Sequence, residues 1–271
     1  MKISVFYDHI LEAHKQTGKA LDELLNAVRN SGIEAVELHL GYLSEHPETV
    51  QLLQDADLKV SCIYEFYELG IKDESEKGRR HVETAVKVGA GRILVVPGFL
   101  HGLEGKRMQM KMKHPKRLDE WMSRNKKLQR MKDGLADIVS LGLEKGVSVT
   151  VEDFDDVHSP LSGMHGIRWF MEQIPELKYT LDTGNFLFYD ESITEVWDAL
   201  ADRIVHVHCK DRCHSDNSCV YVGNGRMRIE QWIGFLKENG YDGYLAIEHF
   251  GVQDQEPCVQ QSVAYLKGIL A

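Results

Sequence analysis

The sequence contains no long uninterrupted apolar segment. No apolar run approaches the roughly 20 residues that a membrane-spanning helix needs. The first residues, MKISVFYDHILEAH, place acidic and histidine side chains where a secretory signal would be apolar. These features predict a cytoplasmic protein that has no membrane partner.

Cysteine is also scarce, and its distribution argues against a disulfide framework. The five cysteines are odd in number, and Cys62 and Cys258 lie far from the group Cys209, Cys213 and Cys219. Three and five residues separate the members of this group, which is not the paired spacing of a structural zinc site. We therefore expect reduced thiols.

Basic residues are outnumbered, and a phosphate-binding loop is missing. With 32 Lys and Arg against 42 Asp and Glu, the net charge is −10, which argues against nucleic acid as the main partner and favours a small-molecule ligand. Gly98, Gly102 and Gly105 fit neither the G-x-G-x-x-G nor the Walker pattern. Nucleotide binding is therefore unsupported.

Short apolar, β-branched runs alternate with amphipathic helical stretches along the whole chain. The expected strands are 3–7, 35–40, 60–64, 92–96, 148–151, 179–181, 204–208 and 244–247. A helix over 20–31 ends at Gly32, and later helices end at Gly89, Gly146 and Gly240. Eight such units in 271 residues predict an α/β fold, a single (β/α)8 TIM barrel over 1–271, with an open doubly wound sheet as the alternative.

The last four expected strands each end on a residue that can bind a metal ion. These residues are Glu152 in VTVED, Asp182 in YTLDTGN, His208 in HVHCKD and Glu248 in LAIEHF. Their separations of 30, 26 and 40 residues each correspond to about one strand, loop and helix, which places them side by side at the mouth of the barrel. Three carboxylates and one imidazole predict one divalent ion, foremost Mn²⁺, with Mg²⁺, Co²⁺ or Zn²⁺ as alternatives.

Strand parity supports this arrangement, because side chains two positions apart share a face. Residues two positions before the four candidates should lie in the layer beneath them: Thr150, Thr180, His206 and Ala246. The intervening apolar residues should face the helices: Val151, Leu181, Val207 and Ile247. His206 is therefore expected to be a core histidine rather than a ligand.

These motifs, with the closing stretch GNGRMRIEQWIGFLKENGYDGYLAIEHF, resemble the xylose isomerase-like barrel superfamily. The resemblance is to its sugar phosphate isomerase/epimerase branch, which includes ketose 3-epimerases, hydroxypyruvate isomerase and inosose dehydratase. It implies that the four candidates bind the metal, that Glu152 and Glu248 also form the acid/base pair, and that the protein is a homodimer. A proton would move beside a substrate carbonyl through a metal-bound enediolate.

Further residues are candidates for substrate binding. Asn185 stands where many relatives have histidine in a DTGH motif, and it could hydrogen-bond a substrate hydroxyl. Lys210, Arg212 and His214 follow the seventh expected strand and could replace a substrate-binding arginine that the sequence does not align. Polar residues at the ends of the first four strands could line the opposite wall of the pocket: His9, His39, Glu65 and His101.

A basic insertion at about 101–130 interrupts the regular pattern. Residues 101–132 hold eleven Lys or Arg against three Asp or Glu, together with five of the nine methionines. The insertion could be a lid whose cations bind a substrate phosphate or carboxylate. The alternatives are a solvated helical insertion, an oligomer contact or a nucleic-acid patch.

The leading functional hypothesis is a divalent-metal-dependent isomerase or epimerase of a small sugar or sugar phosphate. A metal-dependent dehydratase or lyase of a cyclic polyol or keto acid is second, because the same enediolate can expel a neighbouring hydroxyl. An abasic-site DNA endonuclease or a non-catalytic sugar-binding barrel are the remaining alternatives, since one fold hosts many functions.

Overall fold

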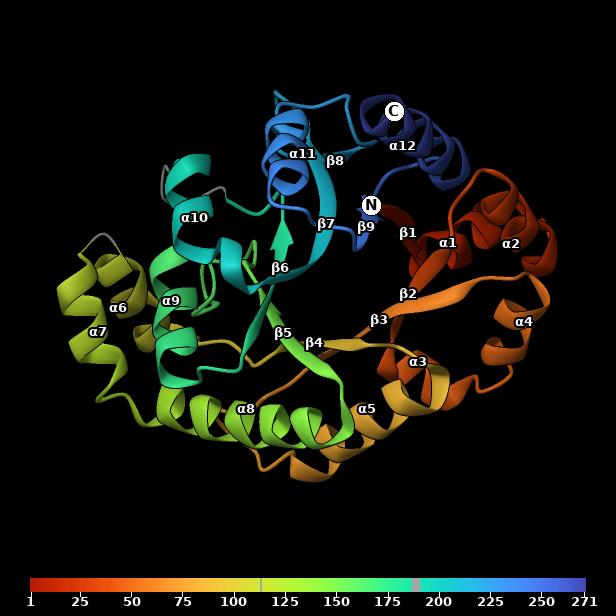
Figure 1. Cartoon of the computed structure of the whole chain (residues 1–271). Helices are drawn as coiled ribbons and strands as arrows, with labels where there is room; N and C mark the ends of the chain where they lie inside the picture. Colours follow the sequence, from red (N-terminus) through yellow and green to blue (C-terminus); the bar gives the residue numbers. More distant parts are fainter. Residues whose placement is uncertain (113, 187–190) are drawn as a thin grey trace. The chain divides into compact units, whose positions relative to one another are not determined.

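The computed structural model describes residues 1–112, 114–186 and 191–271 (Figure 1). Their contacts divide them into two compact units. Unit 1 comprises residues 1–63, 88–90 and 206–271, and unit 2 comprises residues 64–87 and 91–205. Strands β3 (Lys59–Phe66) and β7 (Ile204–Arg212) each contribute residues to both units.

Unit 1 is built on parallel strands. It contains β1 (Lys2–Phe6), β2 (Ala35–His39), β8 (Cys219–Val220), β9 (Tyr244–Glu248), the first residues of β3 and most of β7. Strand β1 pairs in parallel with β2 and β9, and β9 pairs in parallel with β7. Its helices are α1 (Tyr7–Thr17), α2 (Leu21–Asn30), α3 (Leu40–Glu45), α4 (Thr49–Asp55), α11 (Ile229–Glu238) and α12 (Gln255–Leu270). Residues such as Val36 and Ile247 are fully buried, as expected for strands covered on both faces.

Helix α2 shows how the sequence pattern produces the packing. Leu24, Leu25 and Val28 lie on one face and are buried, while the acidic Asp22 lies in the first turn. Gly32 follows with φ of 96°, a left-handed conformation that glycine adopts without a steric penalty. The predicted helix is confirmed to within one residue at each end.

Unit 2 has the same construction. Strands β4 (Arg92–Val96), β5 (Ser148–Glu152) and β6 (Lys178–Asp182) pair in parallel. Its helices are α5 (Ser75–Val88), α6 (Gly102–Met112), α7 (Pro115–Met122), α8 (Lys126–Lys145), α9 (Met164–Gln173) and α10 (Ile193–Leu200). A Cβ on Gly142 would lie 2.6 Å from the Cγ2 of Val149, so glycine allows α8 to pack closely against β5. Val151 shares the parity of Val149, in agreement with the predicted helix-facing set.

The basic insertion is largely helical and belongs to unit 2. It forms α6, α7 and the start of α8. Met108, Met112, Met122 and Met131 are buried, whereas Met110 is 65% exposed. Most of these methionines therefore fill the interior of the unit rather than providing an adaptable outer surface.

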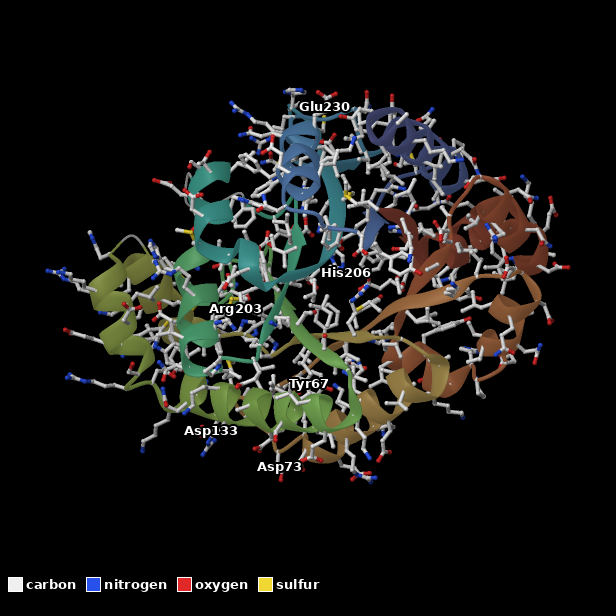
Figure 2. The ribbon with its side chains drawn as sticks, viewed as in Figure 1. Tyr67, Asp73, Asp133, Arg203, His206 and Glu230 are labelled. Carbon is white, nitrogen blue, oxygen red and sulfur yellow. The ribbon has the colours of Figure 1, made fainter. Side chains whose placement is uncertain are left out.

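The order of hydrogen-bonded strands is β6-β5-β4-β3-β2-β1-β9-β7-β8, and β6 also pairs with β7. Apart from β8, this order is circular, which is the strand pairing of a closed (β/α)8 barrel. The eight predicted strands and the fold class are confirmed. Figure 2 shows the contrast in burial between His206, which is fully buried, and the exposed carboxylates Asp73, Asp133 and Glu230.

Two predicted strands extend further than expected, and one short strand was not predicted. Strand β3 ends at Phe66 rather than at residue 64. Strand β7 continues through Lys210 to Arg212, beyond the predicted end at His208. The extension is stabilised by the short strand β8, which pairs antiparallel with it and places Arg212 opposite Cys219. The two-residue β8 was not predicted because it is too short to show an alternating pattern. Among the helices of the described residues, none has the length and apolar composition needed to cross a membrane.

Candidate functional site

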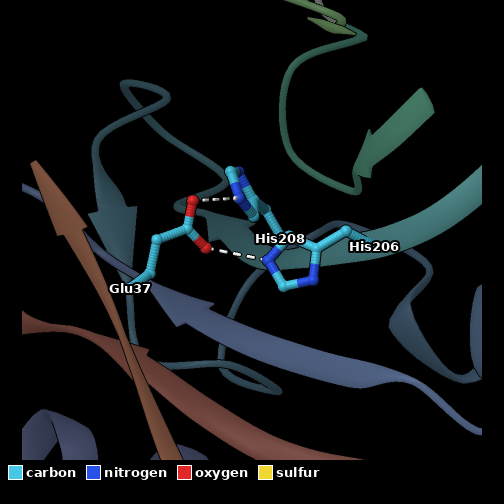
Figure 3. Close-up of side chains that lie close together, drawn as sticks. All are labelled: Glu37, His206 and His208. Atoms are coloured by element: carbon cyan, nitrogen blue, oxygen red, sulfur yellow. Dashed lines mark hydrogen bonds and ion pairs between the residues drawn. The ribbon is translucent and has the colours of Figure 1, made fainter. Parts of the chain in front are cut away.

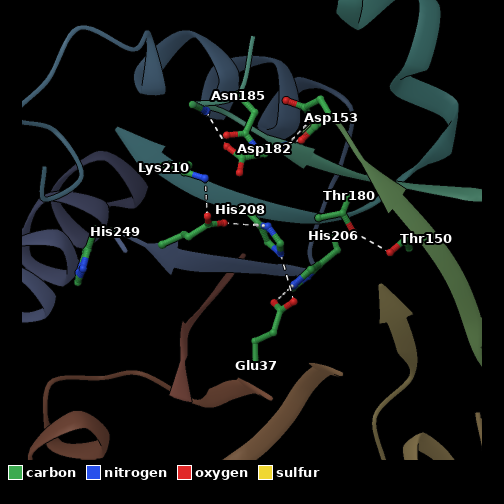
Figure 4. A network of polar contacts seen from close by, with 12 residues as sticks. Glu37, Thr150, Asp153, Thr180, Asp182, Asn185, His206, His208, Lys210 and His249 are labelled. Carbon is green, nitrogen blue, oxygen red and sulfur yellow. Dashed lines mark hydrogen bonds and ion pairs between the residues drawn. The ribbon is translucent and has the colours of Figure 1, made fainter. Parts of the chain in front are cut away.

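In unit 1, β7 and β9 bring two of the predicted ligands together at their carboxyl ends. The strand register aligns His208 with Ala246 and Lys210 with Glu248. The Nδ1 of His208 lies 3.1 Å from one Glu248 oxygen, and the Nζ of Lys210 lies 2.6 Å from the other (Figure 4). All three side chains are buried.

The charges around Glu248 keep it in the carboxylate form. Burial alone would raise its pKa, but the ammonium of Lys210 and the contact with His208 outweigh burial and hold this pKa well below its usual range. A buried ionised carboxylate next to an imidazole nitrogen is a pair of groups suited to a divalent ion.

Below this pair, Glu37 of β2 contacts two histidines of β7 (Figure 3). Its Oε2 lies 2.8 Å from the Nε2 of His206, and its Oε1 lies 3.2 Å from the Nε2 of His208. The three residues are buried, and their nitrogen and oxygen atoms lie within 4.8 Å of one another, so the cluster could hold a metal ion. The direct hydrogen bonds already use these atoms for one another. His206 is thus a buried, hydrogen-bonded core histidine, as predicted.

In unit 2, the other two predicted ligands lie at the ends of β5 and β6. Carboxylate oxygens of Glu152 and Asp182 lie within 4.8 Å of each other, and both side chains are buried. The register aligns Glu152 with Thr180, a two-residue stagger relative to Asp182. Thr180 donates a hydrogen bond to Thr150 at 2.8 Å, so the layer predicted beneath the ligands is buried and internally bonded in this unit.

Asp153, which sequence reasoning did not select, organises the Asp182 end of this pair. Its Oδ1 accepts hydrogen bonds from the Tyr179 hydroxyl and from the backbone N–H of Asp182. Its backbone carbonyl accepts a 2.8 Å bond from the Asn185 amide. Burial raises the pKa of Asp153 well above its usual range, although the Tyr179 and Asp182 bonds oppose the shift. The Oδ1 of Asp182 in turn accepts from the N–H of Gly184 at 2.7 Å.

The predicted substrate-binding residues have varied surroundings. Lys210 is buried against Glu248, and Asn185 is buried against the backbone of Asp153. The Arg212 guanidinium donates to the Asn217 carbonyl at 3.2 Å within the β7–β8 hairpin. His214 is exposed in that hairpin.

The candidates at the ends of the early strands are equally varied. In unit 2, Glu65 is buried with Lys77 at 3.4 Å, and His101 is exposed with its ring 5.3 Å from that of His158. In unit 1, His9 is buried and accepts from the N–H of His249, while His39 caps α3.

Three aromatic rings contact one another in unit 2. Phe154 follows Glu152 by two residues, and its ring meets those of Phe66 and Phe99 edge-on at 5.9 and 5.4 Å between centroids. Phe66 is 42% exposed. The three residues, which we call the aromatic strip, lie at the end of β3 (Phe66) and just after the ends of β4 (Phe99) and β5 (Phe154).

The sequence contains a feature that could have identified Glu37 and Asp153 as residues of the site. Glu37 is the only charged residue in the strand AVELH, and a charge within an apolar strand needs a buried partner. Asp153 directly follows the predicted ligand Glu152 at the end of a strand. Neither signal identifies the partner, since the partners lie up to 171 residues away in sequence.

L-ribulose-5-phosphate 3-epimerase UlaE of Escherichia coli O157:H7 is 26% identical over 141 residues, which cover 52% of this chain and 49% of that protein. The chain thus spans about half the length of this curated relative.

Two solved structures are similar over nearly the whole chain. The probable 3-DHS dehydratase AsbF of Bacillus anthracis has a TM-score of 0.75 and 15% identity, covering 98% of this chain and 99% of that one. D-allulose 3-epimerase from Methylomonas sp. has a TM-score of 0.73 and 13% identity, covering 99% and 98%. A model of the xylose isomerase-like TIM barrel matches residues 25–269. The chain therefore belongs to the xylose isomerase-like TIM barrel family.

Proposed function

We propose that this protein is a divalent-metal-dependent isomerase or epimerase of a small sugar or sugar phosphate. The observation that carries the proposal is the buried, ionised Glu248 held between the imidazole of His208 and the ammonium of Lys210. Membership of the family and the similarity to sugar epimerases support it.

The metal site we propose combines Glu152, Asp182, His208 and Glu248. These residues end β5, β6, β9 and the predicted part of β7, which are consecutive in the circular pairing order. Three carboxylates and one imidazole suit Mn²⁺ first, then Mg²⁺, Co²⁺ or Zn²⁺. Because clustered carboxylates repel one another, a cation is the simplest means of keeping all three ionised.

In the proposed reaction, Glu152 and Glu248 transfer the proton. The cation, when bound, supplies positive charge that stabilises an enediolate as negative charge develops on two adjacent substrate oxygens. One carboxylate removes the proton beside the carbonyl, and the other returns a proton to the opposite face, which inverts the carbon. Return to the neighbouring carbon gives an aldose/ketose isomerisation instead. Lys210 holds Glu248 in the basic form that the removal step needs.

Substrate contacts are assigned as part of the same proposal. Asn185 and Lys210 are buried beside proposed ligands and would contact substrate hydroxyls. Arg212, His214, His101 and Glu65 would bind the more distant substrate groups. A single domain with the 101–130 insertion, a cytoplasmic location and a homodimer stay predictions.

A second candidate is a dehydratase of a cyclic polyol or keto acid. The aromatic strip favours it, because Phe154 follows Glu152 by two residues and flat rings can pack against the apolar face of a cyclic substrate. The similar structure of AsbF is that of a probable 3-DHS dehydratase. The same proton removal would then be followed by loss of a neighbouring hydroxyl as water.

Solvent exchange distinguishes these functions. The Mn²⁺-loaded protein is incubated in D₂O with a panel of ketoses, ketose phosphates and cyclic keto acids, and the carbon-bound deuterium is followed by NMR. We expect deuterium beside the carbonyl without loss of water, and its absence in Glu248→Gln. A dehydrated product would support the second candidate, and binding without any exchange would contradict both. The exposed Glu230→Gln is the matched control and should exchange like the wild type.

A further inference from the structure

Each ring nitrogen of His208 faces a carboxylate oxygen within unit 1. Its Nδ1 lies 3.1 Å from Glu248, and its Nε2 lies 3.2 Å from Glu37. The ring of Phe6 meets the His208 ring edge-on at 4.9 Å between centroids, and the His206 ring does so at 5.3 Å. The orientation of the His208 ring is therefore fixed by contacts on several sides.

The chemistry of Glu37 determines which nitrogen of His208 carries the proton. An ionised carboxylate can only accept hydrogen bonds, so the Nε2 that faces it must donate. Nδ1, the nitrogen that faces Glu248, is then the one that would give up its proton and offer its lone pair to a metal ion. A metal ligand needs that lone pair on the metal side.

Glu37 is itself held in place by a second donor. The Nε2 of His206 lies 2.8 Å from the other carboxylate oxygen, so each oxygen has its own imidazole. Both Glu37 oxygens are thus occupied by imidazole nitrogens, which fixes the position of the carboxylate beneath His208.

Stability alone does not account for this arrangement. Glu37 and both histidines are at most 1% exposed, and its strand neighbours Val36 and Leu38 are fully buried. Buried ionic groups can often be replaced by apolar residues without loss of stability. Because Glu37 and His206 lie directly beneath the proposed ligand His208, we infer that they serve this ligand as well as folding.

We propose that Glu37 is a positioning residue for the metal ligand His208, fixing its ring and its Nε2–H tautomer, with His206 holding Glu37 in turn. This inference rests on the proposed function, because it assumes that His208 binds the metal. Outer carboxylates of this kind typically contribute 10- to 100-fold in metal affinity.

The test measures metal affinity rather than turnover. Apo wild type, Glu37→Gln and Glu37→Asp are titrated with Mn²⁺ by calorimetry, and with Co²⁺ by its visible absorption spectrum. In Glu37→Gln, the amide cannot accept from both imidazoles, so we expect roughly 10- to 100-fold weaker Mn²⁺ binding and an altered Co²⁺ spectrum. Glu37→Asp keeps the charge but shortens the reach, and should bind with an intermediate affinity. It also provides a measurement if the glutamine variant does not fold.

Thr180→Val is the matched control. It removes a buried hydrogen bond from a barrel strand but leaves every proposed ligand and its direct partners in place. Its stability should fall while its Mn²⁺ affinity stays within about 2-fold of the wild type, well below the loss expected from a partner of the ligand. Unchanged affinity and spectrum in both Glu37 variants would overturn the positioning role while leaving the metal site intact. No binding by the wild type would instead overturn the proposed metal site, and the inference with it.

Discussion

Removing the hydroxyl of Tyr179 should destabilise the protein measurably, because that hydroxyl donates to a buried carboxylate. The Tyr179→Phe substitution keeps the ring, which is fully buried, and deletes only the bond to Asp153. A hydrogen bond is worth about 1 kcal/mol when both groups are neutral and up to about 3 kcal/mol when one is charged. We therefore expect the free energy of unfolding to fall by about 1 to 3 kcal/mol, or roughly 2 to 12 °C in Tm.

Tyr265→Phe is the matched control for this measurement. Its hydroxyl also donates to a carboxylate, that of Glu230 at 3.3 Å, but this pair is exposed. The same deletion should therefore change the free energy of unfolding by less than about 0.5 kcal/mol. Both variants are compared by urea denaturation followed by circular dichroism. Equal stabilities for Tyr179→Phe and Tyr265→Phe would refute the view that Asp153 anchors the β6 end through buried hydrogen bonds.

Other predictions test separate parts of the structure. Burial raises the pKa of Glu191 from 4.5 to about 7, so its stabilising contribution is full below pH 4.5 and is lost as the pH rises through 7. In thermal melts, Glu191→Gln should therefore be about 1 to 3 kcal/mol more stable than the wild type at pH 8.5 and equally stable at pH 4.5. The same difference in stability at both pH values would contradict this. The added methyl of Gly268→Ala meets open space in α12, so this variant should stabilise the protein by about 0.5 to 1 kcal/mol. In contrast, Gly166→Ala in α9 places a Cβ on a backbone carbonyl and should destabilise the protein strongly. Similar Tm values for the two variants would contradict the packing described. Lys210→Met leaves the buried Glu248 without its ammonium partner, which should lower the free energy of unfolding by about 3 to 5 kcal/mol in the apo protein and by less with Mn²⁺. Denaturation with and without Mn²⁺ should therefore show that the metal stabilises this variant more than it stabilises the wild type.

The sequence predicts this fold well because each strand carries its own local signal. Apolar β-branched runs identify strands such as β4, whose observed ends, Arg92 and Val96, match the prediction. Glycine stops also act locally: Gly146 caps α8 in the left-handed conformation, as expected. Strand β8 and the extended end of β7 were missed because they depend on pairing with each other.

The site was predicted less completely for a related reason. A ligand at the end of a strand can be recognised from strand parity and the fold, which is how His208 and Glu248 were selected. Their partners cannot be recognised in this way, because the Glu37 contact depends on the packing of β2 near β7. Similarly, the burial of Lys210 against Glu248 depends on the register of β7 with β9. Strand registers within a sheet follow from three-dimensional packing rather than from the local pattern.

Counting the divalent metal bound per chain tests the central claim most directly. Wild type and Asp182→Ala are purified without chelator, incubated with Mn²⁺, passed through gel filtration and analysed for metal content. Asp182 is fully buried and belongs to the proposed ligand set, so its loss should abolish binding. We predict one ion per chain in the wild type and none in the variant. No ion in the wild type would contradict the proposed metal-dependent chemistry, and three ions would point to an endonuclease instead.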